Sequence, residues 1–226
     1  MKQLKILMIG NSFSEDTVRY VYDIAYAAGI ENVIVCNMYI GGCSLYTHCK
    51  NALNNAAAYD FQTYENGEWK HNTEKTLEYG IKYADWDYIS LQQSSGLSGI
   101  PSSYACLQNL MEYVKKTATN GNFKFVWNMT WAYQQDSTHS SFPNYGNSQQ
   151  KMYDMILNCV EKCIKPEKRF VCIIPCMTSI QNARTSFLGD TLTRDGYHLD
   201  NYIGRYIAGL TWFSALTGIS PEKVTY

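Results

Sequence analysis

Short apolar runs alternate with helix-like segments along all 226 residues of the chain. Strands of this length, each followed by a helical segment, favour a parallel sheet with helices on both faces. We therefore expect an α/β fold and one domain over residues 1–226, with ligands bound beyond the carboxyl ends of the strands. The runs that indicate buried strands are Leu4–Ile9, Asn32–Met38, Asp87–Leu91, Lys124–Met129 and Arg169–Pro175.

Helical patterns and turn signals fill most of the remaining sequence. The predicted helices are Glu15–Ala28, Tyr46–Tyr59, Glu74–Tyr83, Ser102–Thr119, Ser148–Ile164 and Tyr202–Leu216. The polar segment Phe61–Asn72 is expected to be a hairpin or another excursion from the fold, with Asn66-Gly67 as a turn. The segment Trp131–Gly146 is expected to be a loop.

Composition and charge exclude several classes of partner. The net charge of −1 gives no electrostatic reason to expect nucleic acid or an anionic membrane surface. No apolar stretch approaches the ~20 residues of a membrane-spanning helix. No signal peptide opens the chain, so a cytoplasmic location is expected unless a leader was removed. The eight cysteines are expected to be free thiols, and neither their spacing nor any other motif predicts a metal or cofactor site.

Two short motifs at opposite ends of the chain carry the parts of a serine hydrolase. Gly10-Asn11-Ser12 follows the first apolar run, and Asp195-Gly196-Tyr197-His198 precedes the last predicted helix. Ser12 could attack an acyl carbonyl while His198 takes its proton. Asp195 could hold the imidazole in the correct tautomer and stabilise its charged form.

Each of these residues also has a simpler interpretation. Ser12 could cap a helix, although Ser14 is the stronger cap because Glu15 and Asp16 follow it in a first turn. His198 could be a surface histidine near a helix start. The remaining histidines, which are expected to be surface or structural, are His48, His71 and His139.

Polar and small residues at the ends of the other predicted strands could complete an acyl-transfer site. Gly41-Gly42 lets the backbone approach a substrate closely. A side-chain amide could add a further donor to a negatively charged oxygen, and the amides placed for this are Gln92, Gln93 and Asn128. Such amides more often bind loop backbone. Trp131 is expected to form a pocket wall, and Asn11, Gly41, Gln93, Asn128 and Trp131 are the candidate substrate contacts.

The order of these pieces resembles that of the SGNH hydrolases, also called GDSL-like esterases and lipases. The first block of that family, usually Gly-Asp-Ser, corresponds to Gly10-Asn11-Ser12, and its Asp-x-x-His block corresponds to Asp195 to His198. Its second block, a glycine after the second strand, fits Gly42 better than Gly41. The resemblance implies a three-layer α/β/α sandwich whose sheet has five parallel strands in the order 2-1-3-4-5, as in flavodoxin.

The third block departs from the usual Gly-x-Asn-Asp, since Leu91-Gln92-Gln93-Ser94-Ser95 stands in its place. This is similar to a subgroup that includes sialate O-acetylesterase-like proteins, where a glutamine replaces the asparagine. By that resemblance Gln92 is the third oxyanion donor, beside the backbone N–H groups of Ser12 and Gly42. The stretch Trp131-Ala132-Tyr133 resembles one in SGNH-like acylhydrolases of gut bacteria.

The sequence therefore predicts a carboxylic ester hydrolase with Ser12, His198 and Asp195 as its triad. The resemblance implies a short acyl group, such as acetyl, on a carbohydrate or another small molecule. The alternatives are a non-catalytic carbohydrate-binding domain on the same fold, or an acyltransferase to a sugar. The oligomeric state stays open.

Overall fold

A mixed sheet of seven strands forms the centre of the computed structural model, which describes residues 2–65 and 67–224. The strand order is β4-β3-β2-β1-β5-β6-β7. The strands are β1 Gln3–Gly10, β2 Asn32–Tyr39, β3 Tyr59–Glu65, β4 Glu68–Lys75, β5 Tyr88–Leu91, β6 Lys124–Asn128 and β7 Phe170–Ile174. The predicted strands correspond to β2, β1, β5, β6 and β7, which are parallel to one another and adjacent in that order.

The prediction of a five-stranded, wholly parallel sheet was wrong. The polar segment Phe61–Asn72, expected to be a hairpin or another excursion, forms most of the β3–β4 hairpin, which extends the sheet. Strand β3 pairs antiparallel with β2, with Cys36 opposite Thr63 and Tyr39 opposite Asp60, and β4 pairs antiparallel with β3. Strand β4 is a largely exposed edge strand, so it carries no buried face and no apolar pattern that would predict a strand. Of the expected Asn66-Gly67 turn, residue 66 lies outside the described residues.

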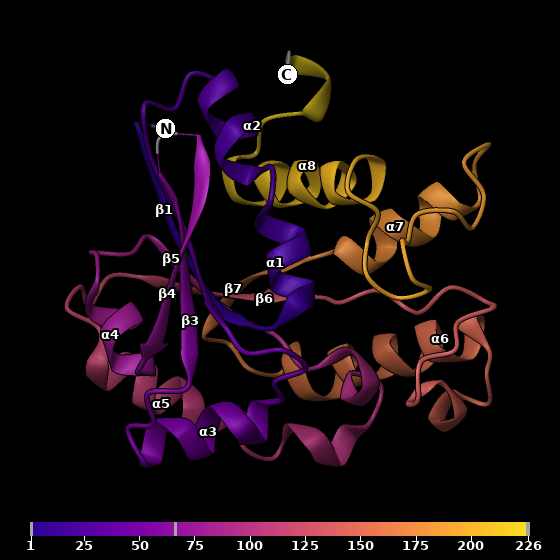
Figure 1. The fold of residues 1–226 in the computed structure, drawn as a ribbon, viewed down its shortest axis with the longest axis horizontal. Coiled ribbons are helices and arrows are strands. Elements are labelled where there is room, and N and C mark those ends of the chain that lie inside the picture. The colour runs from indigo at the N-terminus through magenta and orange to yellow at the C-terminus, as the bar shows by residue number, and fades with distance from the viewer. Residues whose placement is uncertain (1, 66, 225–226) are drawn as a thin grey trace.

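Helices cover both faces of the sheet (Figure 1). Helices α1, α2 and α8 lie on one side and α3, α4 and α5 on the other. The helices are α1 Ser12–Val18, α2 Val21–Ala27, α3 Leu45–Leu53, α4 Leu77–Lys82, α5 Leu107–Thr117, α6 Gln149–Cys159, α7 Cys176–Arg184 and α8 Ile203–Thr217. Short helical turns are η1 Ser95–Leu97, η2 Pro101–Tyr104, η3 Phe142–Tyr145 and η5 Pro221–Lys223, and a π-helical turn, η4 Val160–Ile164, follows α6.

Several helix boundaries differ from the prediction. The first predicted helix is two helices, α1 and α2, and α1 already begins at Ser12 because the Asn11 side chain accepts from the Phe13 N–H and caps it. The second ends at Leu53 rather than Tyr59, since Asn55 has a positive φ of 46° and the chain then enters β3. Helix α7 was not predicted, although its buried residues recur at helical spacing.

Strand β1 is the central strand of the sheet and holds the first motif rigidly. Leu4, Ile6, Leu7, Met8 and Ile9 are at most 1% exposed. Burying each such side chain contributes about 1.5–3 kcal/mol to the folding free energy, so these residues anchor β1 in the core. Ser12 follows two residues after that end. No helix within the described residues has the length and apolar character needed to span a membrane.

Candidate active site

Ser12, His198 and Asp195 lie in one hydrogen-bonded chain. The Nε2 atom of His198 lies 2.7 Å from the Ser12 hydroxyl oxygen, and its Nδ1 lies 2.6 Å from Oδ2 of Asp195. A carboxylate only accepts, so Nδ1 carries the hydrogen and Nε2 presents a lone pair to the serine hydroxyl. The three residues that the sequence motifs singled out are therefore brought together, in the geometry that proton transfer from Ser12 to His198 needs.

The Asp195 carboxylate is held on both of its oxygens. Oδ2 contacts the imidazole, and Oδ1 accepts the backbone N–H groups of His198 at 2.8 Å and Tyr197 at 3.2 Å. Burial raises the pKa of this carboxyl, but the hydrogen bonds from His198 and Tyr197 outweigh it, and the net pKa is lowered. Asp195 is therefore ionised at neutral pH and can stabilise a positively charged imidazole.

Glycine at position 10 lets the turn before Ser12 close tightly. A Cβ at Gly10 would lie 2.5 Å from the Ser14 hydroxyl oxygen and 3.0 Å from Cδ of Gln92, so a larger residue would push both away. Ser14, expected as the helix cap, lies inside α1 instead and donates its hydroxyl toward the Asn11 carbonyl and Oδ1 of Asn37. Asn11 caps the helix in its place.

The Asn11 side chain connects three segments of the chain next to Ser12. Its Oδ1 accepts the Phe13 N–H at 2.9 Å and Nε2 of Gln92 at 2.8 Å, and its Nδ2 donates to the Cys43 carbonyl at 3.0 Å. Asn11 is 1% exposed. Its amide is thus occupied by protein partners, and the structure gives it a positioning role in place of the expected substrate contact.

The Gly41-Gly42 loop between β2 and α3 is open to solvent. Gly42 has a φ of +64°, a conformation that favours glycine, and a Cβ there would meet no atom within 4 Å. Within the described residues, neither the Gly42 N–H nor the Ser12 N–H has a protein acceptor. Gly41 is also exposed. Both backbone donors are therefore free to bind an oxygen of a substrate.

The three candidate amides differ in what they bind. Gln92 donates through Nε2 to Asn11, and its Oε1 accepts Nδ2 of Asn128 at 2.8 Å. Asn128 in turn accepts Nε1 of Trp212 at 3.1 Å. Because an indole N–H only donates, this chain fixes the orientation of both amides and turns the NH₂ end of Gln92 toward Asn11. One N–H of Gln92 has no acceptor among the described residues.

Gln93 and Asn128 are occupied by structural contacts. Gln93 accepts the N–H groups of Leu45 and Ser94, and its Nε2 donates to the carbonyl and hydroxyl of Ser103 at 2.9 and 3.0 Å. Asn128 is 0% exposed. Neither is placed as the expected substrate contact. Gln92 is also buried, at 1% exposed, but of the three amides it alone contacts the turn that carries Ser12.

Trp131 lies under the site rather than at its surface. Its ring stacks on Phe13 with centroids 4.5 Å apart, and its Nε1 donates to the Tyr197 carbonyl at 2.8 Å. It is 0% exposed, so the expectation that it forms a ligand-facing wall does not fit its burial. Its contacts instead support the segment that carries His198.

Two residues near the triad were not identified from the sequence. Asp16 is fully buried one helical turn after Ser12, and it binds the segment that carries His198. His139 packs edge-on against Tyr197, with centroids 4.6 Å apart. Burial, and then the charge of His198, lower the pKa of His139. Asp16 could have been found from its spacing, since it lies four residues after Ser12, on the same face of the helix. No sequence signal pointed to His139.

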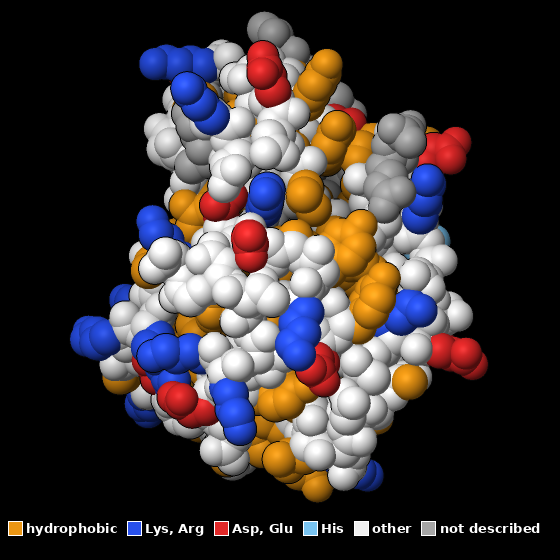
Figure 2. All heavy atoms as spheres, turned by 90° about the vertical axis from the view of Figure 1, so that its left-hand side faces the viewer, with side chains coloured by type: hydrophobic (Ala, Val, Ile, Leu, Met, Phe, Trp, Pro, Cys, Tyr) orange, Lys and Arg blue, Asp and Glu red, His pale blue; other side chains and the backbone are white. Residues whose placement is uncertain are grey.

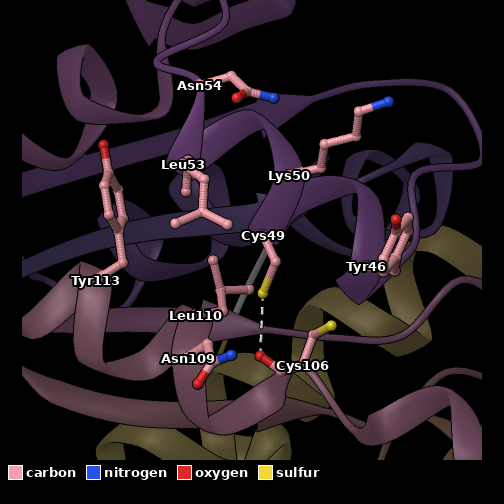
Figure 3. Close-up of a pocket in the computed structure, with 10 residues that line it drawn as sticks. Tyr46, Cys49, Lys50, Leu53, Asn54, Cys106, Asn109, Leu110 and Tyr113 are labelled. Carbon is pink, nitrogen blue, oxygen red and sulfur yellow. Dashed lines mark hydrogen bonds between the residues drawn. The ribbon is translucent and has the colours of Figure 1, made fainter.

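Away from the triad, hydrophobic side chains form a broken band across the face on the left of Figure 1 (Figure 2). A cavity of about 260 Å³ lies between α3 and α5, and Cys49 points into it and donates to the Cys106 carbonyl at 3.0 Å (Figure 3). Burial and the neighbouring Cys106 raise the pKa of Cys49 to about 12, which makes it a poor nucleophile. Cys49 therefore does not make this cavity a second candidate for nucleophilic chemistry.

Comparisons with known proteins agree on family and fold. The model of DUF4886, a domain of unknown function, matches residues 5–226. A DUF4886 family protein of known crystal structure from Bacteroides uniformis ATCC 8492 is 44% identical, with a TM-score of 0.94, and the match covers 99% of this chain and 86% of that one. No functionally curated protein matches the sequence.

More distant structures share the fold at low identity. A candidate SGNH hydrolase from Slackia heliotrinireducens is 18% identical, with a TM-score of 0.63 over 95% of this chain and 99% of that one. A catalytic mutant of an acetylxylan esterase from Geobacillus stearothermophilus is 11% identical, with a TM-score of 0.59 over 96% and 97%. The chain thus has the fold found in SGNH and GDSL-like hydrolases, which the sequence motifs had suggested.

Proposed function

We propose that this protein, which belongs to the DUF4886 family, is a serine hydrolase that cleaves carboxylic esters. The observation that carries the proposal is the hydrogen-bonded chain from the Ser12 hydroxyl through His198 to Asp195. A serine, a neutral imidazole and an ionised carboxylate in this order are what acyl transfer through a covalent intermediate requires. The shared fold with SGNH hydrolases supports the same reaction class.

In the first half of the reaction Ser12 is acylated. The Ser12 hydroxyl oxygen attacks the acyl carbonyl carbon while Nε2 of His198 takes the hydroxyl proton. The carbonyl oxygen becomes negatively charged and is stabilised by the N–H groups of Ser12 and Gly42 and by the Gln92 amide. The bond to the alcohol oxygen then breaks, and His198 returns the proton to the leaving alcohol.

In the second half a water molecule replaces the alcohol. His198 removes a proton from this water, whose oxygen attacks the acyl carbon of acyl-Ser12. The acyl–Ser12 bond breaks, the serine regains its proton from His198, and the carboxylic acid leaves. Asp195 remains ionised throughout and stabilises the imidazolium in both halves.

For the substrate we propose a short acyl ester, such as an acetyl group, on a carbohydrate. The support is the structural likeness to an acetylxylan esterase, together with the sequence motifs. Hydrolysis of acetylated xylo-oligosaccharides, compared with butyryl and octanoyl esters of the same chromogenic alcohol, tests acyl length and alcohol class separately.

The test of the catalytic proposal is labelling with a fluorophosphonate, which phosphonylates activated serines. The intact protein should gain the mass of one probe, and peptide mapping should place it on Ser12. Ser12→Ala should abolish both labelling and hydrolysis of a short-chain ester. Labelling at Ser14, Ser94 or Ser95 would contradict the assignment, and a folded protein that neither reacts nor hydrolyses would favour a binding domain.

A further inference from the structure

A fully buried carboxylate joins the helix of the nucleophile to the segment of the base. Asp16 lies on α1, one turn after Ser12, and is 0% exposed. Its Oδ1 accepts hydrogen bonds from Nη1 of Arg194 at 2.9 Å and Nε of Arg205 at 2.8 Å, and it forms an ion pair with Nη2 of Arg205 at 2.7 Å. Its Oδ2 accepts the Leu199 N–H at 2.8 Å.

Two of the partners of Asp16 lie on either side of Asp195 and His198 in the sequence. Arg194 directly precedes Asp195, and Leu199 directly follows His198. Hydrogen bonds also join the two ends of this segment to each other. The Arg194 N–H donates to the His198 carbonyl at 2.9 Å, and the Arg194 side chain donates to the Leu199 carbonyl. Asp16 thus binds both ends of a closed loop of the chain, while Arg205 attaches the same carboxylate to α8.

Stability alone gives little reason for this arrangement. Removing a carboxylate from water costs several kcal/mol, and well-packed apolar residues often replace a buried ion pair without loss of stability. Geometry gives a better reason, because a misplacement of about 1 Å between reacting groups can cost on the order of 10²-fold in rate. Ser12 and His198 are 186 residues apart in sequence, and Asp16 connects their two segments directly.

We propose that Asp16 is a positioning residue, which sets the distance between the Ser12 hydroxyl and Nε2 of His198 by fixing both ends of the Asp195–His198 segment to α1. The proposal rests on the proposed function, since it gives Ser12 and His198 their catalytic roles. Asp16 does not touch the reacting atoms. Its loss should therefore slow the chemical step and leave ground-state binding of the substrate nearly unchanged.

The test compares Asp16→Asn with Asp23→Asn. Asp23 is a partly buried carboxylate on the neighbouring helix α2 that accepts the Tyr64 hydroxyl at 2.8 Å. Among the described residues it forms no hydrogen bond or ion pair with residues 194–199, so it serves as the control. For Asp16→Asn we expect kcat for a short-chain ester to fall about 10- to 100-fold, with KM changing less than about 3-fold. The rate of fluorophosphonate labelling of Ser12 should fall by a similar factor. Asp23→Asn should have the kcat, the KM and the labelling rate of the wild type.

Arg194→Gln keeps the proposal falsifiable if Asp16→Asn does not fold. Arg194 is about one-third exposed, with 34% of its side chain accessible, so its substitution should be tolerated by the core. This variant should lose kcat in the same direction but by a smaller factor, because Leu199 and Arg205 remain bound to Asp16. In a folded protein that carries both Asp16→Asn and Arg194→Gln, the fold-loss in kcat should be smaller than the product of the two single fold-losses.

A crystal structure of each folded variant supplies a readout that does not depend on activity. The distance between the Ser12 hydroxyl oxygen and Nε2 of His198 should exceed hydrogen-bond length in Asp16→Asn and stay near 2.7 Å in Asp23→Asn. Unchanged distance and unchanged kcat in the Asp16 and Arg194 variants would overturn the proposal. An inactive, unlabelled wild type would instead contradict the proposed function, and the distance would still decide the role of Asp16.

Discussion

The Asn11 side chain donates a hydrogen bond to the Cys43 carbonyl at 3.0 Å, which ties the turn before Ser12 to the loop that carries Gly42. The two loops supply the two backbone donors proposed for the oxyanion. An aspartate would keep the acceptor for Phe13 and Gln92 but would place a negatively charged oxygen against the Cys43 carbonyl. This explains in physical terms why an amide suits position 11 in this chain, where the Gly-Asp-Ser block that it resembles has a carboxylate.

Asn11→Asp should therefore impair catalysis and stability together. We expect kcat for a short-chain ester to fall about 10- to 100-fold, because Gly42 is no longer held beside Ser12. Loss of a buried donor should lower the free energy of unfolding by about 1–3 kcal/mol, measured by urea denaturation. Asn158→Asp, at an exposed position on α6, is the matched control and should change neither quantity by much. Wild-type values for Asn11→Asp would show that the bond to Cys43 is dispensable.

The two adjacent glutamines at the end of β5 are both buried and both hydrogen-bonded, so the effect on kcat should distinguish them. Gln92→Ala should lower kcat by on the order of 10²-fold with a smaller change in KM, since an oxyanion donor acts mainly in the transition state. Gln93→Ala leaves the N–H groups of Leu45 and Ser94 without their acceptor, so its main effect should be on the free energy of unfolding. The same ester assay and urea titration on both variants check this. A larger kcat loss for Gln93→Ala would assign it the oxyanion role.

Much of the fold could be predicted because the signals were local. The apolar runs that became β1, β2, β5, β6 and β7 are visible in the sequence, and the resemblance to SGNH hydrolases implied their order. A hairpin or another excursion was predicted for Phe61–Asn72, but the pairing of the β3–β4 hairpin with β2 could not be predicted in the same way. Strand β4 is polar and exposed, and its partner is chosen by the open edge of β2 rather than by its own pattern.

The residues of the candidate site likewise divide into those with a local sequence signal and those without one. Ser12, Asp195 and His198 stand in recognisable motifs, so the sequence could suggest that they meet. The contacts that decide between Gln92, Gln93 and Asn128 depend on which amide faces which backbone group across strands. Asp16 illustrates the limit, because its partners Arg194 and Leu199 lie 178 and 183 residues away in sequence. No local pattern connects positions so far apart.

Buried His48 should make the protein less stable at mildly acidic pH. It is fully buried, its Nδ1 lies 3.0 Å from the Tyr59 hydroxyl, and burial lowers its pKa to about 3. Between this value and the ordinary ~6.5 the unfolded chain binds a proton that the folded protein does not, so stability falls as pH falls. From pH 7 to pH 5 this group should cost about 2 kcal/mol of unfolding free energy.

His48→Gln checks that expectation, because glutamine can accept the Tyr59 hydroxyl but does not titrate. The measured quantity is the difference in unfolding free energy between pH 7 and pH 5, from urea denaturation at each pH. This difference should be smaller in the variant by about 2 kcal/mol, whatever its absolute stability. An equal difference in both proteins would mean that His48 is protonated in the folded state.

Asp195 and His198 should act as one unit with Ser12. In Asp195→Asn the amide NH₂ group would face Nδ1 of His198 and donate to it. This favours the tautomer that carries its hydrogen on Nε2, and in that tautomer Nε2 cannot accept the Ser12 proton. We expect kcat for a short-chain ester to fall on the order of 10³-fold or more, and Ser12→Ala/Asp195→Asn should lose little beyond Ser12→Ala alone. Because burial raises the pKa of Asp195 less than the hydrogen bonds from His198 and Tyr197 lower it, its carboxylate stays ionised as the pH falls below neutral, and its contact with His198 persists there. A folded Asp195→Asn protein with nearly full activity would show that the contact of Asp195 with His198 has no catalytic role.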